Sequence, residues 1–202
     1  DAMLAQDPRS RVACETLTTT GIVMVAGEVT TSAQVDITAI VRETIKKIGY
    51  DDSRKGFDHS TCAVLVSLGK QSPDISLGVT AETSQSKEQG AGDQGIMFGY
   101  ACRETPELMP APIYYSHKIL QLLSEARRSG VEKHLGPDAK SQVTIRYENG
   151  KPVEATQIVV SHQHVKEDLT SQQISDIVRP YVEKALPAGW ITKNTKWRPS
   201  GR

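Results

Sequence analysis

One pattern of secondary structure, strand–turn–strand–helix, occurs twice along this chain of 202 residues and limits the folds that it can adopt. In the first copy, residues 11–18 and 22–31 are rich in Val, Thr and Ile and are separated by Gly21, which predicts a β-hairpin. Apolar residues at helical spacing then predict a helix over residues 36–48, with Gly49 in the position that commonly ends a helix. We therefore expect a hairpin covered by a helix near the start of the chain.

The second copy has stronger local signals. Residues 142–147 and 153–160 flank a Glu-Asn-Gly turn, and Asn-Gly strongly favours a two-residue hairpin loop. Thr170 and Gln173 then form a capping box, which predicts that a helix begins there and runs to about residue 186. Two such copies predict a two-layer fold of the α+β or α/β class, with helices on one face of a sheet in each unit.

The other segments extend this plan. We expect a third strand over residues 62–68, an amphipathic helix over 114–129 and a turn over 198–201. The run over residues 22–26 is continuously apolar, so we expect it to lie in a core. We divide the chain into a first α/β unit at residues 1–75, an active-site lid with a glycine-rich loop at 76–99, and a second α/β unit at 100–202.

Composition excludes several functional classes. The formal net charge is zero, and no run of Lys and Arg marks a nucleic-acid surface. No stretch approaches the 18 consecutive apolar residues of a membrane-spanning helix. The three cysteines, Cys14, Cys62 and Cys102, lack the CxxC spacing of a zinc site and are odd in number, as in proteins of a reducing compartment. The sequence thus predicts a cytoplasmic protein that binds neither nucleic acid nor membranes.

Residues 88–101, EQGAGDQGIMFGYA, are the most informative stretch for function. Glycine lets the backbone approach a ligand closely, and Asp93 supplies a carboxylate among four glycines. A flexible surface turn is the simpler interpretation. Against it, residues 96–98 are apolar and predict that the loop is anchored to a core, while the polar residues 76–89 resemble a mobile lid. The stretch therefore predicts a small-molecule site.

Several uncommon motifs, in order along nearly the whole chain, resemble the S-adenosylmethionine synthetase (methionine adenosyltransferase) family. They are VACET at 12–16, GEVTTSA at 27–33, GKQSPDI at 69–75, GAGDQGIMFGYA at 90–101, LMPAPI at 108–113, PDAKSQV at 137–143 and SGR at 200–202. The resemblance implies a pseudo-threefold fold of three α/β units, of which this chain holds two and lacks most of the third. It also implies a homodimer with active sites between subunits, and leaves open whether two such dimers pair into a tetramer.

Two glutamates, Glu15 and Glu28, are expected on adjacent strands of the first hairpin. Glutamate in such strands usually lies on a solvated face, but the apolar residues around these two favour partial burial, and paired carboxylates can bind a cation or an amine. The resemblance implies that Glu15 contributes to a potassium site and that Glu28 lies in the methionine-binding region.

The resemblance assigns the remaining site residues. Gln71 and Asp93 match residues that contact methionine, and Asp93 also matches a contact to the nucleotide. The other nucleotide-binding residues that it implies are Asp138, Lys140, Ser161 and Arg202. A lysine is a compact cation suited to phosphate oxygens, so we expect Lys140 to be the catalytic charge stabiliser. His162 and His164 lie two apart without further ligands nearby in the sequence, and we interpret them as structural or surface residues.

The reaction implied is attack of the methionine sulfur on ribose C5′ of ATP, followed by cleavage of the displaced triphosphate to pyrophosphate and phosphate. Two Mg²⁺ ions per site and K⁺ are the implied cofactors. The family's HPDK motif and its second magnesium carboxylate do not occur in these 202 residues, so we expect this portion alone to be inactive. The alternative is a truncated, non-catalytic homologue that acts as a nucleotide-binding or dimerisation module.

Overall fold

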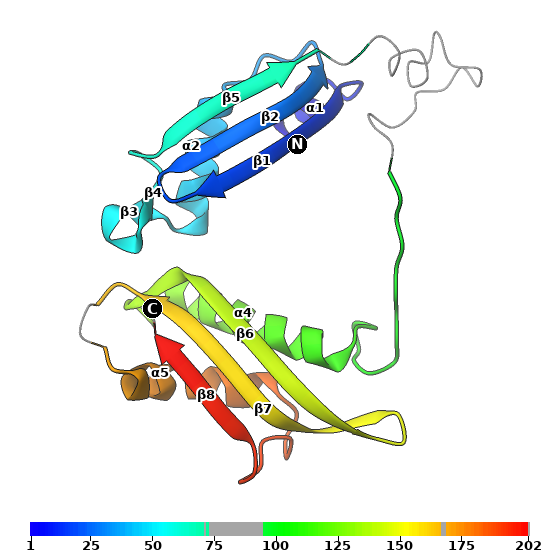
Figure 1. Ribbon diagram of the computed structural model, residues 1–202, viewed down its shortest axis with the longest axis vertical. Coiled ribbons are helices and arrows are strands. Elements are labelled where there is room, and N and C mark those ends of the chain that lie inside the picture. Colours follow the sequence, from blue (N-terminus) through cyan, green and yellow to red (C-terminus); the bar gives the residue numbers. More distant parts are fainter. Residues whose placement is uncertain (71, 73–94, 167–168, 202) are drawn as a thin grey trace. The chain divides into compact units, whose positions relative to one another are not determined.

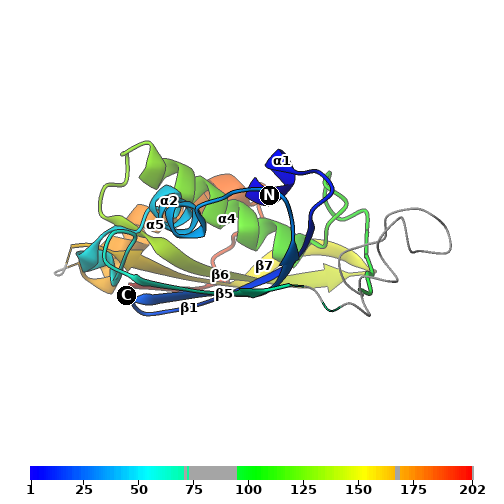
Figure 2. The same cartoon turned by 90° about the horizontal axis from the view of Figure 1, so that it is seen from above.

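The computed structural model describes residues 1–70, 72, 95–166 and 169–201. The chain separates into two compact units, Asp1–Met97 and Phe98–Arg202, each with a sheet and helices of its own. Figure 1 shows the elements of both units, and Figure 2 shows that within each unit the helices lie on one side of the sheet.

The first unit is built on a three-stranded sheet with the order β1-β2-β5. β1 (Arg11–Thr19) and β2 (Ile22–Thr30) are antiparallel, and β5 (Ala63–Gly69) runs parallel to β2. The smaller elements are α1 (Ala2–Gln6), β3 (Asp51–Asp52), the 3₁₀ turn η1 (Ser53–Lys55) and β4 (Phe57–Asp58). The predicted hairpin is therefore confirmed, and the third strand lies one residue further along the chain than expected.

Helix α2 (Ile37–Ile48) connects β2 to the short strands and has the ends that its sequence predicts. The Asp36 side chain accepts a hydrogen bond of 2.9 Å from the Ala39 N–H, which satisfies one of the unpaired donors at the start of the helix. Gly49 ends the helix in the left-handed region, with φ of 115°, and its N–H donates to the Ile45 and Lys46 carbonyls.

The core of the first unit lies between α2 and one face of the sheet, where Val23, Val25, Ile45 and Cys62 are buried. The expectation that all of residues 22–26 lie in a core was wrong: Ile22 and Met24 are 39% and 37% exposed. Successive side chains of a strand point to opposite faces, and α2 covers only the face that carries Val23 and Val25.

The second unit has a sheet with the order β6-β7-β8. β6 (Leu135–Glu148) and β7 (Lys151–His164) form an antiparallel hairpin, and β8 (Lys196–Gly201) is parallel to β7. Helices α4 (Ala111–Arg128) and α5 (Ser171–Ala185) complete the unit. Both hairpin strands are longer than predicted, because the polar motif at residues 137–142 pairs with β7 through a register irregularity.

β8 corrects the prediction of a turn over residues 198–201. Proline cannot donate a ladder hydrogen bond, so Pro199 argues against a central strand but is tolerated on an edge strand such as β8. The strand is held on its helix side by Trp197, whose Nε1–H donates to the Ser175 hydroxyl at 2.7 Å. This tertiary contact is absent from any local sequence pattern.

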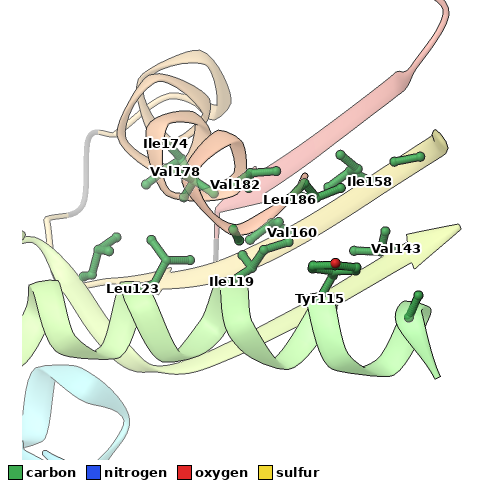
Figure 3. Close-up of a cluster of buried hydrophobic side chains, with 14 residues drawn as sticks. Tyr115, Ile119, Leu123, Val143, Ile158, Val160, Ile174, Val178, Val182 and Leu186 are labelled. Atoms are coloured by element: carbon green, nitrogen blue, oxygen red, sulfur yellow. The ribbon is translucent and has the colours of Figure 1, made fainter. Parts of the chain in front are cut away.

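The core of the second unit fills the space between its sheet and both helices (Figure 3). Side chains from α4, β7 and α5 are fully buried there, among them Ile119, Leu123, Ile158, Ile174 and Val178. The capping box predicted at Thr170 is confirmed, and it starts α5 at the position where its apolar stripe meets the sheet. Burial of this apolar stripe is the main stabilisation of the unit.

Both units therefore follow one plan, in which a hairpin is followed by a helix and then by a strand parallel to the second hairpin strand. The segments β2–α2–β5 and β7–α5–β8 correspond to each other in this respect. The mixed α/β architecture with helices on one face is confirmed, and the pseudo-threefold arrangement stays a prediction. No helix within the described ranges is long and apolar enough to cross a membrane.

Two isoleucines of α4 offer a matched test of this core. Ile119 is completely buried whereas Ile113 is 43% exposed. We expect Ile119→Ala to lower the free energy of unfolding of the second unit by about 2–5 kcal/mol, and Ile113→Ala to lower it by about 1 kcal/mol or less. Trp190 and Trp197, the chain's two tryptophans, both belong to this unit, so their fluorescence in a urea titration reports on it. Equal losses in the two variants would contradict the assigned core.

Candidate functional site

The face of the β6-β7-β8 sheet that points away from α4 and α5 carries the central residues of the candidate site. The other face of the sheet packs against the helices through Val143, Ile158, Val160 and Trp197. Because successive side chains of a strand point to opposite faces, the residues that alternate with these form the uncovered side. We call this side the cationic face; it consists of Lys140, Gln142, Thr144, Gln157, Val159, Ser161, Lys196, Arg198 and Ser200.

The strand register brings two of the predicted nucleotide-binding residues together. Lys140 on β6 pairs directly with Ser161 on β7, and Ser161 pairs with Ser200 on β8. Directly opposite residues of a sheet have their side chains on the same face, about 5 Å apart at Cβ. Lys140 is exposed and Ser161 is half-buried. One mobile cation next to two hydroxyl groups is an arrangement suited to the oxygens of a phosphate group.

Asp138 lies at the end of the same strand, where β6 departs from regular pairing. Its backbone N–H donates to Oε1 of Gln163 at 3.2 Å. The side chain of Gln163 also crosses Gly136 so closely that a Cβ there would lie 2.5 Å from Oε1. The structure thus places Asp138, Lys140 and Ser161 along one end of the β6–β7 hairpin, next to Gln163.

His162 belongs to the opposite, helix-covered side of β7 and is only 3% exposed. Burial lowers the pKa of its imidazole, and Nδ1 lies 2.9 Å from the Gln163 carbonyl oxygen. His164 is part of the same strand, with Nδ1 2.6 Å from the Lys166 carbonyl oxygen. In the described part of the chain, no three His, Cys, Asp or Glu side chains gather in a way that could hold a metal ion.

Glu15 and Glu28 lie on the face of the first sheet that points away from α2. Glu15 pairs with Ala26 and Glu28 with Ala13, so the two glutamates are diagonal neighbours on adjacent strands, about 7–8 Å apart in a regular pair. Both are exposed, so the partial burial expected for them is absent. They remain close enough for a single cation or amine to lie near both.

The glycine-rich stretch is described only from Gly95 onward, and here one expectation was wrong. Ile96, Met97 and Phe98 are 87%, 96% and 93% exposed, so they do not anchor the loop to a core of either unit. Three consecutive apolar residues in a connecting segment become buried only if an apolar surface lies close enough for them to pack against it. The predicted lid, Gln71, Asp93 and Arg202 lie outside the described residues.

Sequence reasoning missed the turn that joins this stretch to α4. Glu104 Oε2 accepts hydrogen bonds from the Ala111 N–H at 2.8 Å and from the Tyr147 hydroxyl at 2.7 Å. Thr105 bonds both the N–H and the carbonyl of Met109, and Leu108 adopts a φ of 59° within the turn. The sequence did contain a signal for this contact: Glu104 precedes a helix that begins with proline, and carboxylates are stabilised near helix N-termini.

The contact between Glu104 and Tyr147 changes the ionisation of the phenol. Partial desolvation of this tyrosine, which is still 40% exposed, followed by the hydrogen bond to the Glu104 carboxylate, raises the pKa of Tyr147 to about 12. Like any tyrosine, Tyr147 is protonated at neutral pH, and its hydroxyl donates the hydrogen bond that ties the turn before α4 to the end of β6. This connection fixes the turn that follows the glycine-rich stretch to β6 of the second unit.

Comparison with protein families accounts for most of the chain. Residues 1–73 match the model of the S-adenosylmethionine synthetase N-terminal domain, and residues 88–202 match that of the S-adenosylmethionine synthetase central domain. The chain belongs to the S-adenosylmethionine synthetase family. Glu15 and Glu28 fall within the match to the N-terminal domain, whereas Lys140 and Ser161 fall within the match to the central domain.

Curated relatives are similar in matches 198 residues long, which cover 95% of this chain and 49% of each relative. They include the S-adenosylmethionine synthases of Bradyrhizobium sp. (strain BTAi1), 59% identical, of Rhodopseudomonas palustris (strain HaA2), 58% identical, and of Nitrobacter hamburgensis, 56% identical. The chain spans about half the length of the curated relatives that it matches.

Within the synthetase N-terminal unit, Gly27 determines how the chain reaches Glu28. Gly27 has a φ of 146°, a conformation that other residues rarely adopt, and a Cβ at this position would overlap the Ala13 carbonyl oxygen. The close approach lets β1 and β2 pair without a shift in register on either side of Gly27. The pairing of β1 with β2 therefore explains why the GEVTTSA motif has a glycine at this position, without reference to ligand binding.

We expect Gly27→Ala to destabilise the β1–β2 hairpin by about 2 kcal/mol or more, because the substitution combines backbone strain with steric overlap. Amide hydrogen exchange of the β1 and β2 residues should accelerate by about 30-fold. Gly69→Ala on β5 is the matched control, since a Cβ there has open space and no positive φ. Unchanged exchange in Gly27→Ala would show that the hairpin adapts to the side chain.

Proposed function

We propose that this protein is an S-adenosylmethionine synthetase, which forms S-adenosylmethionine from ATP and L-methionine with release of phosphate and pyrophosphate. The observation that carries the proposal is the identity of 56–59% to S-adenosylmethionine synthases over 95% of the chain. The cationic face supports it, because Lys140 and Ser161 pair directly across β6 and β7 and can offer a cation and a hydroxyl group to one phosphate. The alternative, a truncated binding or dimerisation module, is not favoured by these comparisons.

The proposed chemistry needs positioning more than covalent catalysis. The methionine sulfur attacks ribose C5′, the C5′–oxygen bond breaks, and its electron pair remains on the triphosphate. A cation close to the departing oxygens stabilises the negative charge that develops there. Lys140 is exposed and has no ion-pair partner among the described side chains, so its charge is available for this role.

The other residues have binding roles in this proposal. Glu28, Gln71 and Asp93 bind methionine, a zwitterion whose amine favours carboxylate partners. The nucleotide is bound by Asp93, Asp138, Lys140, Ser161 and Arg202. Lys140 and Ser161 pair in register, and Asp138 lies at the same end of β6.

Metal ions are proposed as cofactors, with K⁺ near Glu15 and two Mg²⁺ ions per site. Glu15 supplies an exposed carboxylate oxygen with Glu28 nearby, which fits a weakly held monovalent cation. The described residues offer no cluster that would hold Mg²⁺ by itself. Magnesium commonly binds through one or two carboxylates and substrate phosphates. The three free cysteines accord with the proposed cytoplasmic location.

The face of the first sheet that carries Glu15 and Glu28 supports the proposed homodimer, or a pair of such dimers. Leu17, Met24 and Leu65 lie in one register row across β1, β2 and β5 and are 60%, 37% and 52% exposed. Apolar side chains gathered on a sheet face are typical of an interaction surface rather than of scattered exposure. A second copy that presents the same face would bury this row symmetrically.

Replacement of Lys140 tests the synthetase proposal. In a polypeptide as long as the curated relatives, we expect Lys140→Met to lower kcat by about 10²-fold or more, with a smaller change in the KM for ATP. Lys151→Met, which removes an exposed lysine at the start of β7, is the control and should leave both constants near their original values. ATP binding without any turnover in the unsubstituted protein would instead favour the binding module.

Replacement of Leu65 tests the dimer. We expect Leu65→Asp to raise the dimer dissociation constant by about 100-fold, because it places an unpaired charge in the centre of the apolar row. Sedimentation at micromolar concentration measures the change, with Val131→Asp, at a 70% exposed position in the second unit, as the control. A monomer in the unsubstituted protein would contradict the proposal directly.

A further inference from the structure

The cationic face carries two more cations besides Lys140. Arg198 and Lys196 are alternate residues of β8 and lie on the same side of the sheet as Lys140, since Trp197 between them packs toward α5. All three are exposed. From β6 to β8, the register rows are Lys140–Ser161–Ser200, Gln142–Val159–Arg198 and Thr144–Gln157–Lys196.

No carboxylate occurs in these three rows, and the acidic residue nearest to them on β6 is Asp138, two residues before Lys140. Elsewhere in the second unit, two arginines have acidic partners: Arg146 pairs with Glu148 and Glu154, and Arg179 pairs with Glu183. Within the described ranges, neither Arg198 nor Lys196 forms an ion pair. Three exposed cations on one sheet face, with no acidic side chain in these rows, give this side of the sheet a positive potential that attracts anions.

The spacing of these charges fits an extended anion. Arg198 lies two strands and one register row from Lys140, which corresponds to about 12 Å between their Cα atoms in a regular sheet. The long side chains of both residues can converge on a linear chain of phosphates between them. Ser161 and Ser200 lie beside that line and provide hydroxyl donors at the Lys140 end.

We propose that Arg198 is a positioning residue that binds the end of the polyphosphate chain remote from the reacting carbon, with Lys196 as an outer charge that attracts it. This inference rests on the proposed function. A guanidinium presents a rigid fork that binds phosphate oxygens in pairs, whereas an ammonium acts as a point charge. Arg198 therefore suits the terminal phosphate, and Lys140 suits the oxygens whose charge changes as the bond breaks.

The two roles predict different kinetics. The terminal phosphate has a similar charge before and during bond breaking, so Arg198 binds substrate and transition state almost equally and affects KM rather than kcat. Lys140 acts mainly in the transition state and affects kcat. Lys196, further along the face, contributes a long-range attraction that salt weakens.

The experiment compares Arg198→Gln with Arg128→Gln, which removes an exposed arginine at the helix-covered side of the same unit. Both are made in a polypeptide of the relatives' length. For Arg198→Gln we expect the KM for ATP and the dissociation constant for inorganic tripolyphosphate, measured by calorimetry, to rise by about 10- to 100-fold. We expect kcat to change by less than about threefold. Arg128→Gln should change none of these values.

A conservative variant separates charge from geometry. Arg198→Lys keeps the charge but loses the fork, so it should recover part of the tripolyphosphate affinity. Lys196→Gln should weaken tripolyphosphate binding at low salt and have little effect at high salt.

Two results would overturn the inference. One is unchanged tripolyphosphate affinity in Arg198→Gln, and the other is a change in sedimentation, which would show that Arg198 pairs with a carboxylate of a second copy. Failure of the proposed function would give a different result, in which the unsubstituted protein does not form S-adenosylmethionine. In that case, loss of tripolyphosphate binding in Arg198→Gln would still support a phosphate-binding role for Arg198.

Discussion

The burial of one face of each sheet under helices is the constraint on which the rest of this structure depends. In the second unit, α4 and α5 cover Ile158, Val160 and Trp197, and the strand period of two then assigns every alternate residue to the uncovered side. Lys140 and Ser161 are placed on that side by the same packing that buries their neighbours. A shift of one residue in register would exchange the two sets, so core packing also specifies the site.

The two uncovered faces differ in chemistry although the two units share a plan. The face of the first sheet combines two glutamates with the exposed row of Leu17, Met24 and Leu65, which suits association with another surface. The cationic face of the second sheet has uncharged polar side chains around Lys140 and Arg198, which suits an extended anion. A repeated α/β unit can therefore serve two purposes by varying only the residues that do not contact its helix.

Much of this could be predicted from local sequence patterns. The Asn149-Gly150 turn, the Thr170 capping box and the helix end at Gly49 each involve residues within four positions of one another, and each was found where the sequence predicted it. The motif order was sufficient to indicate the synthetase family, because motifs are properties of the chain itself. The resemblance also assigned Lys140 and Ser161 to a nucleotide site, whereas their pairing across β6 and β7 came from the strand register.

Other features depended on contacts between distant residues. The strand β8 forms because Trp197 bonds Ser175 and because an edge position tolerates Pro199, and neither condition can be read from the RPSG segment alone. Ile22 and Met24 are exposed because α2 covers only one side of β2, and Glu104 meets Tyr147 across 43 residues. The sequence alone determined most of the local elements and the family. Tertiary packing decided which strand residues are buried and which are exposed, because that depends on which face of each sheet the helices cover.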